Sequence, residues 1–340
     1  MKSLRRISDA LTSHRSPPQH LTTLIKRPSL VGTGWWIYNP RDLNSQGEFL
    51  AVVPGDRTQV REARDDKEEG RYGAAMNNDP EALARDLLQQ DDGTGAPTIK
   101  LEPVTTGMSG AAVFRATQQG HAPRYMKVGF DAAAGDMREE IARTQWLAGR
   151  GIAVPSVLRV EDRGDSVAVL MAALAGVPAD ISRLATPRLI AALAQAVKAL
   201  HALPAADCPF DETLDARLAR AQAAVDAGAI DPAEFEPHNR NTAPAEMLRR
   251  LRAVPPHEDV VVLHGDLTLG NIIVDESGAC GFIDCGNAGR GDRYTDLALL
   301  HADIVAHRGP RAGAGFLAAC GVKHWDAAKA QYFLDLYELF

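Results

Sequence analysis

Two carboxylates and one amide stand in a spacing that suits phosphoryl transfer. Asp266 and Asn271 share the segment His264–Asn271, and Asp284 follows in Ile283-Asp284-Cys285-Gly286. Phosphoryl transfer needs one carboxylate to orient the attacking hydroxyl and accept its proton, together with oxygen ligands for Mg²⁺. Asp266 is therefore the candidate catalytic carboxylate, and Asn271 and Asp284 are the candidate metal ligands. Asp and Asn are also common in turns, but turn chemistry does not explain the whole set.

An expected strand and an expected hairpin position these three residues. Val260–Leu263 is a short apolar strand that leads directly into His264. Residues 271–274 and 280–283 form a hairpin-like pair that turns through Glu276-Ser277-Gly278 and returns Asp284 to the same place. The Asp-x₄-Asn spacing equals that of the protein-kinase catalytic loop, and Asp284-Cys285-Gly286 stands where protein kinases have Asp-Phe-Gly.

A lysine and a glutamate upstream have the types needed to hold nucleotide phosphates. Lys127 lies in the expected strand 124–128, and Glu139 and Glu140 lie on the expected helix 137–147. An ion pair between strand and helix would hold the lysine amine toward the α- and β-phosphates. The helical register favours Glu140, whose neighbours on that face are apolar, and Glu139 remains the alternative.

A loop rich in glycine and small hydroxyls lies between the first two expected strands. In Thr105-Thr106-Gly107-Met108-Ser109-Gly110, the backbone N–H groups near Ser109 and Gly110 suit contacts to phosphate, with an ordinary hairpin turn as the alternative. The chain has no Gly-x₄-Gly-Lys-Ser/Thr motif, which excludes P-loop chemistry. It also lacks histidine and cysteine at zinc spacing and the Gly-x-Ser-x-Gly elbow of a serine hydrolase.

The expected elements change from strands to helices along the chain. A helix capped by Asp79-Pro80-Glu81 runs to about Gln90. The strand-like runs that follow are 99–104, 111–117, 124–128, 157–160 and 167–171, with the helix 137–147 between the third and the fourth. Helical patterns dominate afterwards, at 186–200, which opens with Thr186-Pro187 as cap and first-turn proline, and at 212–227, 243–252, 293–307 and 326–338. A sheet-rich half followed by a helix-rich half predicts an α+β fold with two lobes.

Composition places the chain among ordinary globular proteins. Its 340 residues are 45% hydrophobic and 24% charged, which is enough for a core of enzyme size. The four cysteines include no Cys-x-x-Cys pair, so we expect reduced thiols in a cytoplasmic protein. No apolar run approaches the roughly 18–20 residues of a membrane span.

The charge is unevenly distributed along the chain. Residues 1–75 hold 12 Lys and Arg against 9 Asp and Glu, whereas the remainder holds 25 against 35. An acidic body disfavours nucleic acid and favours a cationic small ligand. Residues 1–75 show no helical or strand period, so we expect a disordered extension or a start codon assigned too early, with Met76 as the true first residue. A functional arm is the alternative.

The spacer after Asp284 indicates the size of the acceptor. Only seven residues separate Asp284 from the helix that begins near Asp292, and no Ala-Pro-Glu follows. A protein kinase places its activation segment there, so this chain has no platform for a peptide and we expect a small-molecule acceptor. Asp296, inside that helix, is expected to brace the catalytic loop, with a direct catalytic role as the alternative.

Taken together, these strings resemble the aminoglycoside O-phosphotransferases, specifically their 3′-phosphotransferase class, over about residues 76–340. The resemblance rests on Val104–Phe114, Met126–Val128, Glu140 with Trp146-Leu147, Cys208–Asp211, Ala243–Glu246, His264–Asn271, Gly281–Gly286, Asp292–Tyr294 with Asp296, and Glu338–Phe340. It implies a bilobal, protein-kinase-like fold with an N-lobe at 76–173 and a C-lobe at 174–340. It also implies an enzyme that uses ATP and Mg²⁺ to phosphorylate a sugar hydroxyl of antibiotics such as kanamycin and neomycin, which confers resistance.

The resemblance also implies roles for individual residues. Asp266 would be the catalytic carboxylate, Asn271 and Asp284 would ligate Mg²⁺, and Lys127 would contact the phosphates of ATP and pair with Glu140. The segment Met171–Leu174 would be the hinge that holds adenine, through Met171, Ala172 and Leu174. An acidic loop and the C-terminal end would hold the aminoglycoside amines, at Glu234, Glu236, Asp303, Glu338 and Phe340.

Four positions depart from the family pattern around the acceptor. Asn287 and Ala302 stand where arginine is frequent, Pro237 where an acidic residue is expected, and Tyr337 where aspartate is usual. We therefore expect a narrowed or shifted range of antibiotics. Two alternatives remain: a kinase for another small alcohol, such as an amino sugar, choline or a macrolide, and a nucleotide-binding scaffold without activity. The sequence leaves open whether the protein is a monomer or a weak dimer.

Overall fold

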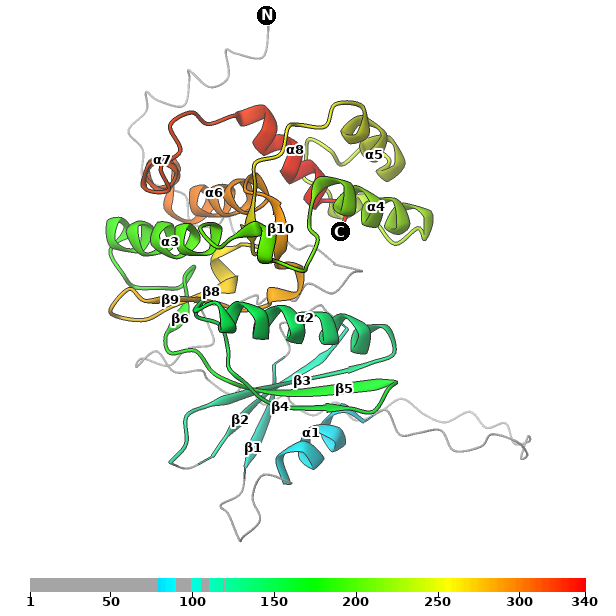
Figure 1. Cartoon of the computed structure of the whole chain (residues 1–340), viewed down its shortest axis with the longest axis vertical. Coiled ribbons are helices and arrows are strands. Elements are labelled where there is room, and N and C mark those ends of the chain that lie inside the picture. The colour runs from blue at the N-terminus through cyan, green and yellow to red at the C-terminus, as the bar shows by residue number, and fades with distance from the viewer. Residues whose placement is uncertain (1–78, 90–98, 105–109, 119) are drawn as a thin grey trace, which may run out of the picture.

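The computed structural model describes residues 79–89, 99–104, 110–118 and 120–340. A twisted sheet occupies one end of the described chain and a group of helices occupies the other, with helix α2 between them (Figure 1). The expected extension 1–75 and the loop residue Ser109 lie outside the described residues. Within those residues, no helix combines the length and the apolar character needed to cross a membrane.

The sheet has five antiparallel strands and confirms the strand-rich first half. The strands are β1 (Lys100–Val104), β2 (Ala112–Thr117), β3 (Arg124–Phe130), β4 (Val157–Asp162) and β5 (Ser166–Ala172). Their order in the sheet is β1-β2-β3-β5-β4. Helix α2 (Ala132–Gly149) connects the third strand to the fourth, as the sequence predicts.

Each face of the sheet is covered by one helix. On one face, Leu83 and Leu87 of helix α1 (Pro80–Gln89) pack in a buried cluster with Met126 of β3. On the other face, Met137 of α2 packs in a second cluster with Val169 of β5. Because side chains alternate along a strand, residue 127 lies on the α2 face when Met126 faces α1. The sheet thus directs Lys127 toward α2 and the helical part.

The helical part contains the predicted helices and one that was not predicted. Its helices are α3 (Thr186–His201), α4 (Leu214–Asp226), α5 (Pro244–Ala253), α6 (Tyr294–Arg308), α7 (Pro310–Ala319) and α8 (Ala327–Tyr337). Helix α7 was not predicted because it is only ten residues long and begins at Gly309-Pro310, a dipeptide that also marks turns. The predicted cap at Thr186 is wrong, since Thr186 is already helical and Ala185 precedes it without a side-chain capping bond.

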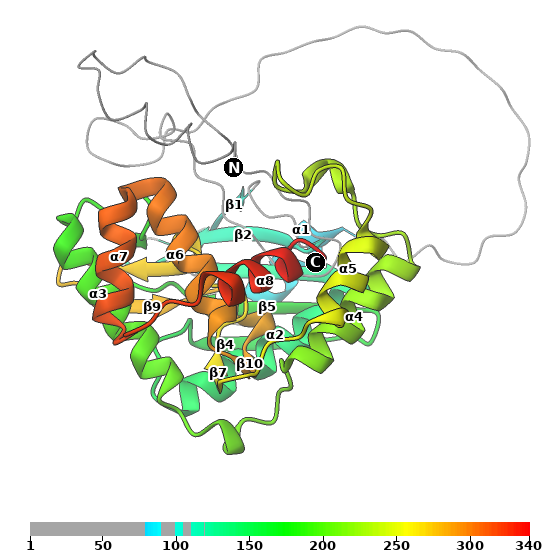
Figure 2. The same cartoon turned by 90° about the horizontal axis from the view of Figure 1, so that it is seen from above.

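Two apolar clusters hold these helices together. Leu193 of α3, Leu300 of α6 and Phe316 of α7 share one cluster, and Leu248 of α5 and Phe333 of α8 share the other. Viewed from above, α8 lies between the α3–α6–α7 group and the α4–α5 pair (Figure 2). The C-terminal end of α8 is therefore directed into the middle of the molecule.

Short strands flank the segments that contain Asp266, Asn271 and Asp284. Strand β7 (Val260–Leu263) pairs antiparallel with β10 (Gly289–Asp292). Strand β8 (Ile272–Val274) pairs with β9 (Cys280–Phe282) as the predicted hairpin, and β6 (Val177–Pro178) pairs with β8 on its other side. Strands β6 and β10 were not predicted, because two to four residues give too little alternation to read.

Candidate active site

The loop after β7 passes through a position that only glycine suits. Gly265 has a φ of +85°. A Cβ added there would lie 2.1 Å from the carbonyl oxygen of Asn287. This close approach brings the loop that carries Asp266 against the segment that follows Asp284, as the predicted hairpin requires.

Asp266 is fully buried and accepts one side-chain hydrogen bond on each oxygen. The Tyr337 hydroxyl donates to Oδ1 at 2.7 Å, and the Asn271 amide donates from Nδ2 to Oδ2 at 3.1 Å. The same amide donates to the backbone carbonyl of Asp266 at 2.9 Å. Burial raises the pKa of Asp266 to about 6, although the hydrogen bond from Tyr337 acts in the opposite direction.

Two buried oxygens beside Asp266 have no hydrogen-bond partner among the described residues. They are Oδ1 of Asn271 and Oδ2 of Asp284. A buried polar atom without a partner costs roughly 1–3 kcal/mol, so each such atom calls for an explanation, of which a bound ion is one. Amide and carboxylate oxygens are ligands that suit Mg²⁺. The residues present therefore fit a magnesium ion held by Asn271 and Asp284.

The backbone at Asp284 is held in an uncommon conformation. Its φ of 56° and ψ of 53° lie in the left-handed region, which a non-glycine residue rarely adopts. Such conformations persist where the surrounding structure fixes them, and they concentrate at functional sites. Here the conformation follows directly after β9 and turns the side chain toward Lys127.

Lys127 connects the sheet to the helical part through two ion pairs. Its Nζ lies 2.6 Å from Oε1 of Glu140 on α2 and 2.5 Å from Oδ1 of Asp284. Burial by itself would lower the pKa of Lys127, but the charges of Asp284 and Glu140 outweigh burial and raise that pKa above its ordinary value. Glu139 instead pairs with Arg143 at 2.8 Å. Of the two alternatives that the sequence left open, Glu140 is the partner of the lysine.

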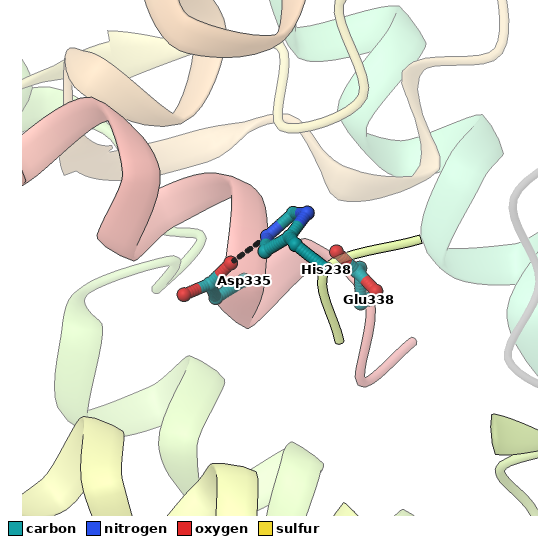
Figure 3. A group of neighbouring side chains, drawn as sticks. All are labelled: His238, Asp335 and Glu338. Carbon is teal, nitrogen blue, oxygen red and sulfur yellow. Dashed lines mark hydrogen bonds and ion pairs between the residues drawn. The ribbon is translucent and has the colours of Figure 1, made fainter. Parts of the chain in front are cut away.

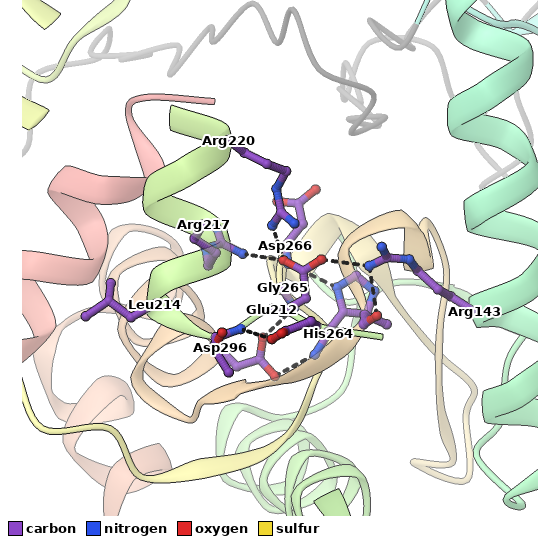
Figure 4. Close-up of polar contacts among 12 residues, drawn as sticks. Arg143, Glu212, Leu214, Arg217, Arg220, His264, Gly265, Asp266 and Asp296 are labelled. Atoms are coloured by element: carbon purple, nitrogen blue, oxygen red, sulfur yellow. Dashed lines mark hydrogen bonds and ion pairs between the residues drawn. The ribbon is translucent and has the colours of Figure 1, made fainter. Parts of the chain in front are cut away.

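Asp296 braces the catalytic loop from α6. Its carboxylate accepts hydrogen bonds from the backbone N–H groups of His264 and Gly265, each at 2.9 Å, and lies 2.9 Å from Nε2 of His201 (Figure 4). Nε2 of His264 lies 2.8 Å from the backbone oxygen of Ile283, which ties the loop to the residue just before Asp284. These contacts match the bracing role expected for Asp296.

A buried ionic cluster that sequence reasoning missed also joins the two parts. Arg143 of α2 donates to Oε1 of Glu212 at 2.7 Å and to Ala288 O at 3.0 Å. Arg217 and Arg220 of α4 pair with the other oxygen of Glu212 (Figure 4). The signal was present, since Arg143 follows Glu140 by three residues and so lies on the same buried face of the helix. Its partner lies 69 residues away, which no local pattern reveals.

Hydrogen bonds within the protein engage the carboxylates of Asp303 and Glu338, which were predicted to bind the acceptor. Asp303 accepts from Leu269 N at 2.7 Å and lies 3.0 Å from Nδ1 of His307. Glu338 is buried and accepts from Glu236 N at 2.9 Å and from Asn239 Nδ2 at 3.1 Å. Both carboxylates therefore hold loops in place, and their contact with an acceptor stays a prediction.

The predicted acidic loop is anchored by a buried aromatic side chain. Phe235 is buried, while Glu234 and Glu236 on either side of it are partly exposed. At the C-terminal end, the guanidinium of Arg217 lies 4.9 Å from the centre of the Phe340 ring. The structure thus places Glu234, Glu236 and Phe340 around the end of α8.

A histidine and two carboxylates lie together where this loop meets α8. His238, Asp335 and Glu338 offer potential metal-ligand atoms within 4.8 Å of one another (Figure 3). Asp335 already lies 3.3 Å from His238 and accepts from Asn239 at 2.9 Å. These bonds attach the acidic loop to α8, so the group has a structural role.

The predicted hinge lies at the end of β5. Ala172 N donates to Ser156 O at 2.9 Å, Met171 is buried in the sheet, and Leu174 contacts the backbone near Gly281. Gly110, the described end of the glycine-rich loop, has a φ of +66° and lies beside the start of α2. The nucleotide-binding roles of Met171, Ala172, Leu174, Ser109 and Gly110 stay predictions.

Comparison with known proteins places this fold and site in one family. The phosphotransferase enzyme family matches residues 100–331. The streptomycin 3″-kinase of Streptomyces griseus is 38% identical over 68% of this chain and 89% of that protein. The aminoglycoside 3′-phosphotransferase of Streptomyces fradiae is 36% identical over 72% of this chain and 96% of that protein.

Solved structures agree with the sequence relatives. The crystal structure of an aminoglycoside-3′-phosphotransferase of type VIII matches with a TM-score of 0.67 and 30% identity, over 75% of this chain and 98% of that one. The aminoglycoside phosphotransferase APH(3″)-Id from Streptomyces rimosus, in complex with ADP and streptomycin, matches with a TM-score of 0.64 and 32% identity, over 76% and 97%.

The fold and the site together define a kinase with a bilobal architecture and a small-molecule acceptor. The chain belongs to the phosphotransferase enzyme family and is a small-molecule kinase of the aminoglycoside phosphotransferase type. The predicted family and fold class are confirmed.

Proposed function

We propose that this kinase transfers the γ-phosphoryl group of ATP, with Mg²⁺, to the 3′-hydroxyl of an aminoglycoside and so confers resistance in the cytoplasm. The observation that carries the proposal is a pair of buried oxygens, on Asn271 and Asp284, that have no hydrogen-bond partner among the residues the structure describes and lie next to Asp266 and Lys127. ATP as the donor is supported by the related structure that holds ADP.

Each residue of the site has a defined task in this reaction. Asp266 orients the acceptor hydroxyl and accepts its proton as the new O–P bond forms and the bond to the ADP leaving group breaks. Lys127, fixed by Glu140, holds the phosphates of the nucleotide. Asn271 and Asp284 would hold the metal ion, which neutralises charge on the phosphate oxygens when it is bound.

A cationic acceptor is supported by the charge and by the acidic loop. Residues 76–340 carry ten more acidic than basic residues. Glu234 and Glu236 are partly exposed on a loop that Phe235 anchors, so their charges are accessible to a ligand. Carboxylates of this kind attract ammonium groups and contribute more to specificity and association rate than to affinity.

A second candidate is phosphorylation of streptomycin at its 3″-hydroxyl. It is favoured by the 38% identity to a streptomycin 3″-kinase and by the related structure that holds streptomycin.

A coupled ADP-release assay with kanamycin, neomycin and streptomycin separates these candidates, followed by ³¹P–¹H NMR to locate the phosphorylated hydroxyl. Turnover of kanamycin or neomycin at the 3′-hydroxyl supports the first proposal. Turnover of streptomycin alone selects the second. Turnover of no aminoglycoside, together with phosphorylation of choline or a macrolide, would contradict both.

A further inference from the structure

Tyr337 lies in direct contact with the carboxylate that performs the proposed reaction. It is the last residue of α8, it is 9% exposed, and its hydroxyl donates to Oδ1 of Asp266 at 2.7 Å. Asn271 holds the other oxygen, Oδ2, at 3.1 Å. Tyr337 and Asn271 thus come from separate elements and donate hydrogen bonds to opposite oxygens of one carboxylate.

An aspartate carboxylate held at only one oxygen does not have a fixed orientation. Its terminal torsion is broad, because the two oxygens rotate about an sp³–sp² bond with no deep minimum. A general base must present an oxygen at about 2.6–3.2 Å from the proton that it accepts. A second donor, on the opposite oxygen, fixes the plane of the carboxylate before the acceptor arrives.

Resting on the proposed function, we infer that Tyr337 is a positioning residue that sets the plane of the Asp266 carboxylate for the acceptor hydroxyl. A carboxylate oxygen has two lone-pair directions. Oδ1 therefore accepts from Tyr337 along one direction and keeps the other for the acceptor. Tyr337 keeps its own proton throughout, and the acceptor proton goes to Asp266.

The surroundings hold Tyr337 firmly enough for this task. Leu336 and Leu339 on either side are fully buried in the cluster that α8 forms with α4 and α5. The next residue, Glu338, accepts from the backbone of Glu236 in the acidic loop. Consecutive residues thus bind the catalytic base and the loop predicted to bind the acceptor, so the base and the loop are aligned by one helix end.

The chain offers a matched control on the same helix. Tyr332 is also a partly buried tyrosine of α8, and its hydroxyl donates to Leu251 O at 3.0 Å, on the side of α5. Tyr337→Phe and Tyr332→Phe each remove one hydroxyl and one hydrogen bond. Melting temperature, kcat, and the KM values for ATP and acceptor are measured for both variants.

Tyr337→Phe should lower kcat roughly tenfold to a hundredfold, the range expected for one hydrogen bond to a charged group. Both KM values should stay within about twofold, because the contact acts on the base and not on binding. Tyr332→Phe should keep the wild-type kcat. Equal kcat values for the two variants would overturn the inference. A Tyr337→Phe enzyme faster than the wild type would also overturn it, because the tyrosine would then compete with the acceptor for Asp266.

A double-mutant cycle separates positioning from a merely structural role. In an Asp266→Asn background no carboxylate remains to be oriented, so adding Tyr337→Phe should change the residual rate less than about twofold. The same loss in both backgrounds would overturn the inference. If the wild type phosphorylates no aminoglycoside, the proposed function fails independently of this inference. The double-mutant cycle is then measured on the slow hydrolysis of ATP, in which Asp266 orients a water molecule. The same non-additivity is expected for that rate.

Discussion

The nucleotide side and the acceptor side of the site use their carboxylates in different ways. On the proposed nucleotide side, Lys127 converges with Glu140 and Asp284, while Oδ1 of Asn271 and Oδ2 of Asp284 have no hydrogen-bond partner within the described part of the chain. On the acceptor side, the carboxylates of Asp303 and Glu338 are engaged by backbone N–H groups of the protein itself.

This difference indicates where the chemistry and where the recognition reside. Leaving buried oxygens without partners costs free energy of folding, so the nucleotide side is built for a ligand that completes it. On the acceptor side the carboxylates of Asp303 and Glu338 hold loops, while Glu234 and Glu236 lie partly exposed on the acidic loop. Changes on the first side should stop the reaction, whereas changes on the second should alter acceptor affinity.

The largest effect should come from the residue between the two sides. Asp266→Ala should lower kcat by roughly 10²–10⁴-fold, because it removes the base that orients and deprotonates the acceptor. Nucleotide affinity should stay close to that of the wild type, measured by titration with ADP. A correctly folded Asp266→Ala protein with wild-type turnover would contradict the role of this residue.

The pH profile should show the same base titrating. Burial raises the pKa of Asp266 to about 6, and the protonated carboxyl cannot accept a proton. The ratio kcat/KM for the acceptor should therefore fall about tenfold per pH unit below pH 6 and be level above it. Measuring the KM for ATP at each pH separates this loss from a loss of nucleotide affinity. A profile that stays flat down to pH 4.5 would contradict the assignment.

Neighbouring glutamates on α2 provide a sharper test of the nucleotide side. Glu140→Gln removes the charge that fixes Lys127, and it should raise the KM for ATP roughly tenfold. Glu139→Gln, which affects only the exposed end of a pair with Arg143, should leave that KM unchanged. The acceptor KM should not move in either variant. Equal ATP KM values for the two variants would show that the lysine is held without Glu140.

On the acceptor side, the double variant Glu234→Gln/Glu236→Gln should raise the acceptor KM roughly three- to tenfold with little change in kcat. Raising salt to physiological strength shortens the Debye length to about 8 Å and should weaken acceptor binding more in the wild type than in this variant.

The variant Glu81→Gln/Glu276→Gln removes two exposed charges elsewhere and serves as the control. An unchanged acceptor KM would point to a neutral or weakly charged acceptor.

The parts of this molecule that were predictable from sequence depend on local pattern. The five strands of the sheet, the helix between them and the spacing from Asp266 to Asn271 are properties of neighbouring residues, so alternation and spacing were sufficient. Helix α7 was not predicted because its start at Gly309-Pro310 also fits a turn.

Contacts between distant segments were not predictable in the same way. Arg143 and Glu212 are 69 residues apart, and Asp266 and Tyr337 are 71 apart. Whether a carboxylate such as that of Glu338 turns toward a ligand or toward a backbone N–H depends on tertiary packing, which no local pattern encodes. The sequence therefore predicted the reaction type, whereas the internal bonds of the acceptor-side carboxylates became known only from the structure.

If Asn271 and Asp284 ligate Mg²⁺, nucleotide affinity measured by calorimetry with and without Mg²⁺ should show it most directly. Wild-type protein should bind ADP more tightly with Mg²⁺, and Asp284→Ala should bind it almost equally in both conditions. Asp303→Asn, which changes a carboxylate on the acceptor side, should keep the wild-type difference. An Asp284→Ala protein that retains the full Mg²⁺ effect would contradict the account.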